Sequence, residues 1–323
     1  MISLYHKYFP RASFWLTLFL LGTLLVPVLA DPVQAGTVVL VKSTNIPQYD
    51  MAAKSITERL RESADNVVVK QIDYRNSGEN DRFWNEIKTS SPMLVITIGS
   101  QATRGALQNI TDLPVIFTMV PNQPNFSGRP STKRDIGGVT LNIPVNSQFK
   151  YLKKALPATR RVGFIYSPEA ESAFQAASKS AQSIGLQLVV EKANSERDVP
   201  DAIRRMLSEI DAFWMPPDKL MYENIVFRFV VLECFKNGIP IVSVYRRRAE
   251  EGIPLAIGVD YEDIGRQTAD LVLKRLSNGK FALPVVEQPR KFLLYINDGV
   301  VSNLNIKIPD DMLNLTVPVK SGS

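Results

Sequence analysis

Two aspartates, Asp218 and Asp260, are the acidic residues best placed for chemistry, because each follows a short apolar run that predicts a buried strand. Paired carboxylates are the usual equipment of general acid and base catalysis. Nothing in the sequence sets the separation of these two, and no nucleophile accompanies them, so we do not predict catalysis. Each carboxylate is suited instead to bind a ligand ammonium or hydroxyl group. The alternatives are that Asp218 caps a helix and that Asp260 fixes the backbone beside it.

An anion site is predicted where Gly99-Ser100-Gln101 follows the apolar run 94–98 and opens a helix. Ser100 is expected to be the N-cap of that helix, where free backbone N–H groups and the helix dipole favour a carboxylate or a phosphate. Alternatively, Ser100 caps its own helix and touches no ligand. The segment contains no Walker motif and no dinucleotide-binding glycine motif.

The segment Tyr166-Ser167-Pro168-Glu169 has the corresponding position in the second half of the chain. Its Ser-Pro-Glu sequence is typical of a helix start, and Tyr166 either stacks on a flat ligand or packs in the core. The polar residues that follow predicted strands form the candidate ligand site, and they are Ser43, Ser100, Gln101, Thr118, Tyr166, Ser167, Asp218, Tyr245, Asp260 and Tyr261. We predict no catalytic residue, no metal site and no cofactor.

Residues 1–35 are expected to be a cleavable secretory signal. Lys7 and Arg11 precede the apolar run 14–27, and Val33-Gln34-Ala35 is a small-residue cleavage context. The run is shorter than the roughly 20 residues that cross a bilayer. A lipid anchor would need a cysteine just after this run, and the sequence has none there. The sequence therefore predicts an exported, soluble protein of the periplasm.

The amino-acid composition excludes several further kinds of catalytic or binding site. Signal removal also removes His6, the single histidine, so no imidazole remains for catalysis or metal binding. Cys234 is the single cysteine, cannot form an internal disulfide, and is expected to be buried and unreactive. The formal net charge is +6, but the basic residues are mixed with acidic ones. Even Arg246-Arg247-Arg248 is followed by Glu250-Glu251, which favours an ion-paired surface over a nucleic-acid or membrane patch.

From Thr37 onward, β-branched apolar runs alternate with amphipathic stretches, which predicts an α/β fold with parallel sheets and crossover helices. A polar loop at 125–135 and a short strand at 139–141 separate two such series. The expected main strands lie at 37–42, 67–69, 94–98 and 115–120, and then at 161–166, 186–191, 212–215, 239–244 and 255–259. Two doubly wound lobes joined by a hinge follow from this order. Ligands bind at the carboxyl ends of such strands, where loops and helix N-termini converge.

Several segments carry a family resemblance: 95–102 (VITIGSQA), 113–117, 161–168 and 258–261, followed by a tail with the sequences LPVVEQP at 283–289 and LNIKIP at 304–309. The sequence in these places resembles the ABC-transporter substrate-binding protein family typified by tryptophan- and tyrosine-binding lipoproteins. The tail is the most specific part of the resemblance, which covers most of the chain after the signal.

The resemblance implies a type I periplasmic binding fold, with two lobes, three hinge crossings and a small ligand held between the lobes for a membrane permease. It also implies that strand-end Ser and Thr groups and helix N-termini hold a ligand carboxylate, while aromatic side chains hold its ring. One departure is the loop after the fourth strand. The family usually has Gly-Asp-Pro there, whereas this chain has Val120-Pro121-Asn122-Gln123-Pro124, so the resemblance does not fix the ligand.

The expected organisation is a signal peptide at 1–35, a first lobe of 36–142 plus about 261–288, and a second lobe of 143–260 plus about 289–320. The expected function is capture of a small molecule, with aromatic amino acids and related compounds among the candidates, for an ABC permease in the inner membrane. The protein is expected to be a monomer that is not an enzyme and binds no nucleic acid. The alternative is a sensory or accessory binding protein of the same fold that reports its ligand to a membrane kinase or an outer-membrane receptor system.

Overall fold

The computed structural model describes residues 36–63, 67–74, 80–121, 135–221, 223–279, 285–320 and 322. The predicted signal at 1–35, most of the predicted loop at 125–135 and residues 122–124 of the departure from the family pattern lie outside the described residues. No helix in these described ranges combines the length and the apolar character that crossing a bilayer requires.

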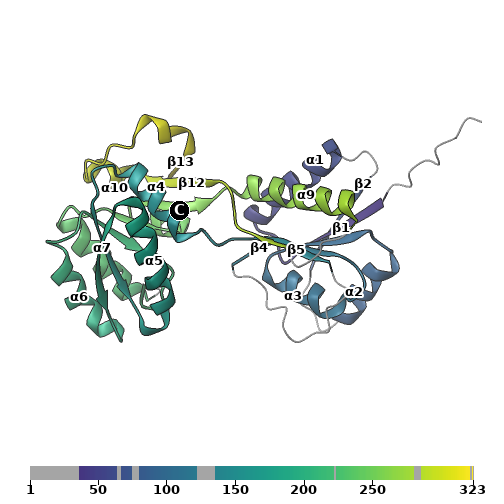
Figure 1. Cartoon of the computed structure of the whole chain (residues 1–323), viewed down its shortest axis with the longest axis horizontal. Coiled ribbons are helices and arrows are strands. Elements are labelled where there is room, and N and C mark those ends of the chain that lie inside the picture. The colour runs from purple at the N-terminus through teal and green to yellow at the C-terminus, as the bar shows by residue number, and fades with distance from the viewer. Residues whose placement is uncertain are drawn as a thin grey trace, which may run out of the picture. The chain divides into compact units, whose positions relative to one another are not determined.

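In the described chain, six strands form a first sheet in the order β11-β5-β4-β3-β1-β2, and every neighbouring pair is parallel. Its elements are β1 (Gly36–Lys42), β2 (Val67–Asp73), β3 (Leu94–Ile98), β4 (Val115–Val120), β5 (Ile136–Thr140) and β11 (Val285–Glu287), with helices α1 (Pro47–Ser63), α2 (Asn80–Thr89), α3 (Ser100–Asn109) and α9 (Tyr261–Asn278) (Figure 1). Val38 and Leu40 pack towards α1 and α9, whereas Val39 and Val41 pack towards Trp84 of α2. Helices therefore bury both faces of β1, which explains its continuous apolar sequence.

Seven described strands form a second sheet in the order β13-β12-β10-β9-β8-β6-β7. Its elements are β6 (Arg161–Tyr166), β7 (Gln187–Lys192), β8 (Ala212–Met215), β9 (Ile241–Ser243), β10 (Leu255–Val259), β12 (Phe292–Asn297) and β13 (Thr316–Val319), with helices α4 (Val145–Ala155), α5 (Glu171–Ile184), α6 (Val199–Met206), α7 (Asn224–Lys236), α8 (Arg246–Glu250) and α10 (Asp298–Asn303) and the 3-10 turns η1 (Pro168–Ala170), η2 (Glu196–Asp198), η3 (Lys219–Met221) and η4 (Asp310–Leu315). Trp214 packs on Phe149 of α4, with ring centres 4.8 Å apart, while Phe213 faces the α6 and α7 side. This sheet too is covered on both faces.

The architecture confirms the predicted α/β class with two parallel-dominated sheets. One pair departs from the parallel pattern, because β12 runs antiparallel to β10. After β8 the chain forms two separate elements, η3 and α7, rather than one continuous helix. The reason is Asp218, whose carboxylate accepts the N–H of Leu220 at 2.9 Å and closes a separate turn before α7 begins.

The chain passes between the two sheets in three places: from β5 to α4, from β10 to α9 and from β11 to β12. The first and third passages are the segments 141–144 and 288–291. The second has almost no loop, because Val259 ends β10, Asp260 is the N-cap of α9 and Tyr261 is its first residue. A strand of the second sheet thus continues directly into a helix that packs on the first sheet.

Cys234 lies in α7 with a fully buried side chain. Burial raises the pKa of its thiol to about 12. The reactive thiolate is therefore scarcely populated at neutral pH, which agrees with the predicted buried and unreactive cysteine.

Helix α9 lies along α1 in the first sheet's outer layer (Figure 1). The two helices approach each other closely at Gly265, where an added Cβ would lie 2.5 Å from the carbonyl oxygen of Ala52 and 2.8 Å from the Cβ of Ser55. Backbone rather than a flexible side chain occupies that space. The packing of α9 on α1 therefore requires glycine at this position.

We expect Gly265→Ala to lower the free energy of unfolding by about 1–3 kcal/mol, because the extra methyl group forces the two helices apart. Gly299→Ala is the matched control, since a Cβ there would meet Asn297 Oδ1 at an ordinary 3.6 Å. Urea denaturation followed by circular dichroism measures both. A Gly265→Ala protein as stable as the parent would contradict the close helix approach.

Candidate functional site

The residues predicted from the sequence lie at the carboxyl ends of parallel strands, in three groups. The first sheet holds Ser43, Ser100, Gln101 and Thr118, the second sheet holds Tyr166, Ser167, Asp218 and Tyr245, and the crossing between β10 and α9 holds Asp260 and Tyr261. This edge is where open parallel sheets bind ligands.

Helix α3 begins with Gly99 as its N-cap, so the prediction that Ser100 is the N-cap was wrong. Gly99 has a φ of 86°, and an added Cβ would lie 2.4 Å from Tyr49 Oη and 2.8 Å from Ser43 Oγ. Glycine is needed at this junction because both its backbone angle and its surroundings exclude a side chain. Ser100 and Gln101, the first two residues of the helix, have exposed side chains.

Ser43 supplies the cap that α3 lacks in its own sequence. Its Oγ accepts the N–H of Ala102 at 2.9 Å and donates to the carbonyl oxygen of Ile98 at 2.8 Å. Thr118 is similarly engaged, because its hydroxyl accepts a hydrogen bond from Thr268 of α9 at 2.9 Å. Both predicted residues are buried, and each stabilises the junction of a strand with a helix.

Both carboxylate oxygens of Asp218 bond to backbone groups. Oδ2 accepts the N–H of Ser167 at 2.8 Å, and Oδ1 accepts the N–H of Leu220 at 2.9 Å. The residue is only 4% exposed. Asp218 therefore joins the turn after β6 to the turn after β8, as the capping alternative expects, and a contact with ligand stays a prediction.

Tyr166 packs within an aromatic stack. Its ring lies 5.0 Å from that of Phe174 at an interplanar angle of 13°, and 5.5 Å from that of Phe164. Burial and the nearby Glu171 carboxylate raise the pKa of its phenol. Tyr245, in contrast, is 40% exposed directly before α8. Of these two predicted aromatic residues, Tyr245 has the more accessible ring.

Asp260 holds the second crossing together. Its Oδ1 accepts the N–H of Asp263 at 3.0 Å, and its Oδ2 pairs with Lys291 Nζ at 2.7 Å. Burial opposes ionisation, but the hydrogen bonds from Lys291 and Asp263 outweigh it and lower the pKa of the Asp260 carboxyl. The carboxylate is thus charged at neutral pH and links the second crossing to the third.

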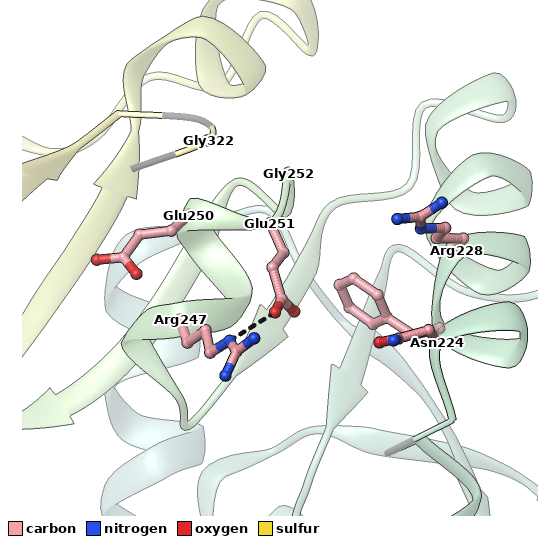
Figure 2. Close-up of a pocket in the computed structure, with 8 residues that line it drawn as sticks. Asn224, Arg228, Arg247, Glu250, Glu251, Gly252 and Gly322 are labelled. Carbon is pink, nitrogen blue, oxygen red and sulfur yellow. Dashed lines mark hydrogen bonds and ion pairs between the residues drawn. The ribbon is translucent and has the colours of Figure 1, made fainter.

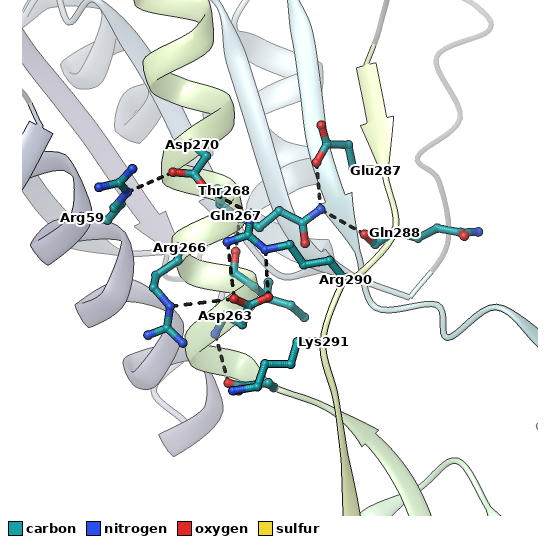
Figure 3. A network of polar contacts seen from close by, with 12 residues as sticks. Arg59, Asp263, Arg266, Gln267, Thr268, Asp270, Glu287, Gln288, Arg290 and Lys291 are labelled. Atoms are coloured by element: carbon teal, nitrogen blue, oxygen red, sulfur yellow. Dashed lines mark hydrogen bonds and ion pairs between the residues drawn. The ribbon is translucent and has the colours of Figure 1, made fainter. Parts of the chain in front are cut away.

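A network of ion pairs also ties the third crossing to α9 (Figure 3). Arg290 pairs with Asp263 and with Asp270, each at 3.1 Å, and Asp270 pairs in turn with Arg59 of α1 at 3.0 Å. These side chains are partly exposed, so each pair contributes at most about 1 kcal/mol. Their shared carboxylates instead fix the position of the connecting segment against the helix.

Three tyrosines and one arginine gather at the second crossing. We call this set the tyrosine–arginine cluster: Tyr49 of α1, Tyr261 of α9, Tyr295 of β12 and Arg246 of α8. The guanidinium carbon of Arg246 lies 5.5 Å from the ring centre of Tyr295, and the Tyr295 ring covers Gly258, where a Cβ would be 2.3 Å from its Cε2. Both Tyr49 and Arg246 act electrostatically on the Tyr261 phenol.

The cluster combines three phenols, of which Tyr49 and Tyr261 are partly exposed and Tyr295 is buried, with one guanidinium. Burial raises the pKa of all three phenols, to about 12 for Tyr295. The phenols therefore stay neutral at physiological pH, while the guanidinium is charged. Such a set suits a flat ligand with an acidic group, since aromatic faces pack on the flat part and arginine binds the acid.

The candidate residues predicted from the sequence include Tyr261 but not Tyr49 or Tyr295, and Arg246 is predicted only as part of an ion-paired surface. Gly258 was the available signal, because a glycine inside a strand often marks the close approach of a bulky group. No local pattern identifies Tyr49, which reaches Gly99 only through the packing of α1 on the sheet.

A cavity of about 550 Å³ opens elsewhere, beside α7 and α8 (Figure 2), and its walls are formed by Asn224, Phe227, Arg228, Arg247, Glu250, Glu251, Gly252 and Gly322. None of the predicted site residues contributes to these walls. Along α8, Arg246 pairs with Glu250 at 2.8 Å, Arg247 with Glu251 at 2.8 Å and Arg248 with Glu251 at 2.7 Å. The predicted ion pairing of the basic triplet is confirmed.

Metal binding finds no support in the described ranges, where no group of three or more His, Cys, Asp or Glu side chains could hold a metal ion.

Residues 39–320 match a family model described as ABC transporter substrate binding protein. The chain therefore belongs to the ABC transporter substrate-binding protein family. It is similar to a tyrosine-binding protein of Clostridioides difficile (strain R20291), with 22% identity over 279 residues that cover 81% of this chain and 78% of that protein.

Two solved structures share the fold. The ligand-free, open structure of a substrate binding protein with adhesive properties from Clostridium difficile has a TM-score of 0.70 and 18% identity, covering 88% of this chain and 99% of that one. An ABC domain from Streptococcus pneumonia in complex with L-Trp has a TM-score of 0.53 and 21% identity, covering 88% of this chain and all of that one. The predicted type I periplasmic binding fold is thereby confirmed.

Asp218→Ala is expected to lower the free energy of unfolding by about 1–3 kcal/mol, because it leaves two backbone N–H groups without their acceptor. Ser100→Ala is the matched comparison, and a change within about 0.5 kcal/mol is expected because the lost hydroxyl is exposed and caps nothing. Urea unfolding distinguishes the two. Equal stability of the two variants would contradict the structural role of Asp218.

Proposed function

We propose that this protein captures an aromatic amino acid or a related small molecule outside the cytoplasmic membrane and delivers it to an ABC permease. The tyrosine–arginine cluster is the observation that supports this function best, since it offers aromatic surface and one cation at the strand edge that binds ligands in parallel sheets. A relative named as a tyrosine-binding protein and a similar domain in complex with L-Trp agree with that chemistry.

The ligand would lie between two lobes, of which the first comprises 36–142 and about 261–288 and the second 143–260 and about 289–320. Tyr261 and Tyr49 would contact it from the first lobe, and Tyr295 and Arg246 from the second. Closure of the lobes about the three crossings would then bury the ligand and form the surface that the permease recognises. The predicted residues with accessible side chains, Ser100, Gln101 and Tyr245, are proposed to line the same site.

The proposed role is binding without turnover. Asp218 and Asp260, the two carboxylates that could act as acid and base, are both engaged by backbone N–H groups, and Asp260 also pairs with Lys291. Residues 36–323 contain no histidine. The protein would act as an exported monomer in the periplasm after removal of residues 1–35.

Isothermal titration calorimetry with L-tyrosine, L-tryptophan, L-phenylalanine, L-leucine, a nucleoside and a pentose tests the proposal. We expect saturable binding of at least one aromatic amino acid, tighter than that of L-leucine. A bound ligand at 100 times its Kd should add about 2.7 kcal/mol of stability, which a parallel melting experiment can detect. Binding of the nucleoside or the pentose, with no binding of any aromatic amino acid, would contradict the proposal.

A further inference from the structure

Most basic side chains near the candidate site are neutralised by carboxylates of the protein itself. Lys42, at the end of β1, pairs with Asp50 at 2.7 Å, and Lys291 pairs with Asp260 at 2.7 Å. The charge of each ammonium group is thus balanced by a carboxylate of the protein. A ligand anion at this edge therefore needs a cation that has hydrogen-bonding capacity to spare.

Arg246 has that capacity. Its Nε donates to Glu250 Oε1 at 2.8 Å. Within the described part of the chain, no hydrogen bond or carboxylate engages its terminal nitrogens Nη1 and Nη2. Glu250 thus binds the Nε edge of the guanidinium and leaves the two terminal NH2 groups, which match the two oxygens of a carboxylate.

The strand register places this arginine beside the aromatic residues of the cluster. Arg246 is the first residue of α8, which follows β9, and the last residue of β9, Ser243, pairs with Ala256 of β10. Ala256 lies opposite Tyr295 in the antiparallel pair of β10 with β12. The 5.5 Å separation between the Arg246 guanidinium carbon and the Tyr295 ring centre follows from this arrangement.

We propose that Arg246 is the specificity-determining residue of the site, and that Nη1 and Nη2 bind the carboxylate of the ligand while the tyrosines of the cluster pack on its ring. The ligand class is then an aromatic carboxylate. This inference rests on the proposed function and goes further in naming the group that the protein recognises and the residue that recognises it. Arg247 next to it is excluded, because its side chain is 84% exposed and lines the cavity beside α7 and α8 rather than the tyrosine–arginine cluster.

The test compares the parent protein with Arg246→Gln and with Arg247→Gln as the matched control. Calorimetry is carried out with L-tyrosine, with tyramine, which lacks the carboxylate, and with 3-(4-hydroxyphenyl)propionate, which lacks the amine. For the parent we expect loss of the carboxylate to weaken binding more than loss of the amine. Arg246→Gln should weaken L-tyrosine binding by about tenfold to over a hundredfold and leave tyramine binding unchanged or stronger. Arg247→Gln should bind all three compounds within about twofold of the parent.

Three results would overturn the assignment of Arg246. One is binding of L-tyrosine by Arg246→Gln as tightly as by the parent. Another is an equal loss of L-tyrosine and tyramine binding in Arg246→Gln, which would indicate a role in packing rather than in carboxylate recognition. The third is an equal loss in Arg247→Gln. Failure of the parent to bind any aromatic amino acid is a separate outcome, since it contradicts the proposed function itself. Thermal melting of each variant checks that it is folded.

Discussion

The second crossing between the two sheets is the constraint on which the rest of the arrangement depends. Because only Asp260 separates β10 from α9, this residue follows the strand, caps the helix and pairs with a lysine at the same position. Its carboxylate does so with two bonds, one to the N–H of Asp263 and one to Lys291. Lys291 belongs to the third crossing, so this charged pair ties two of the three connections between the sheets together. The low pKa of Asp260 keeps this pair charged at neutral pH.

The same crossing explains why the tyrosine–arginine cluster forms where it does. Tyr261 is the first residue of α9 because Asp260 caps that helix, and Tyr295 reaches the crossing because Gly258 leaves room for its ring. Arg246 lies near this crossing because the connection between β9 and α8 is short. Parts of both sheets thus contribute to one aromatic and cationic group. A ligand bound there would contact each of the two proposed lobes.

Much of the fold could be predicted from the sequence. Buried parallel strands such as 94–98 and 115–120 are short, mainly apolar runs, which can be recognised without knowing what they pack against. The antiparallel strand β12 could not be oriented in this way, since its direction depends on the partner strand. Ser100 has the residue type of an N-cap, yet Gly99 takes that place because Tyr49 and Ser43, from distant parts of the chain, fill the space around it. Sequence reasoning located the strand edge correctly. It could not tell which of the polar side chains there would form hydrogen bonds with the protein's own backbone.

A ligand bound at the second crossing would draw the two proposed lobes together. Small-angle X-ray scattering of the protein with and without the tightest-binding aromatic amino acid tests it most directly. We predict a smaller radius of gyration in the presence of ligand, because contacts with both lobes form only when the lobes approach each other. A radius of gyration that stays the same while calorimetry shows the ligand to be bound would contradict the account.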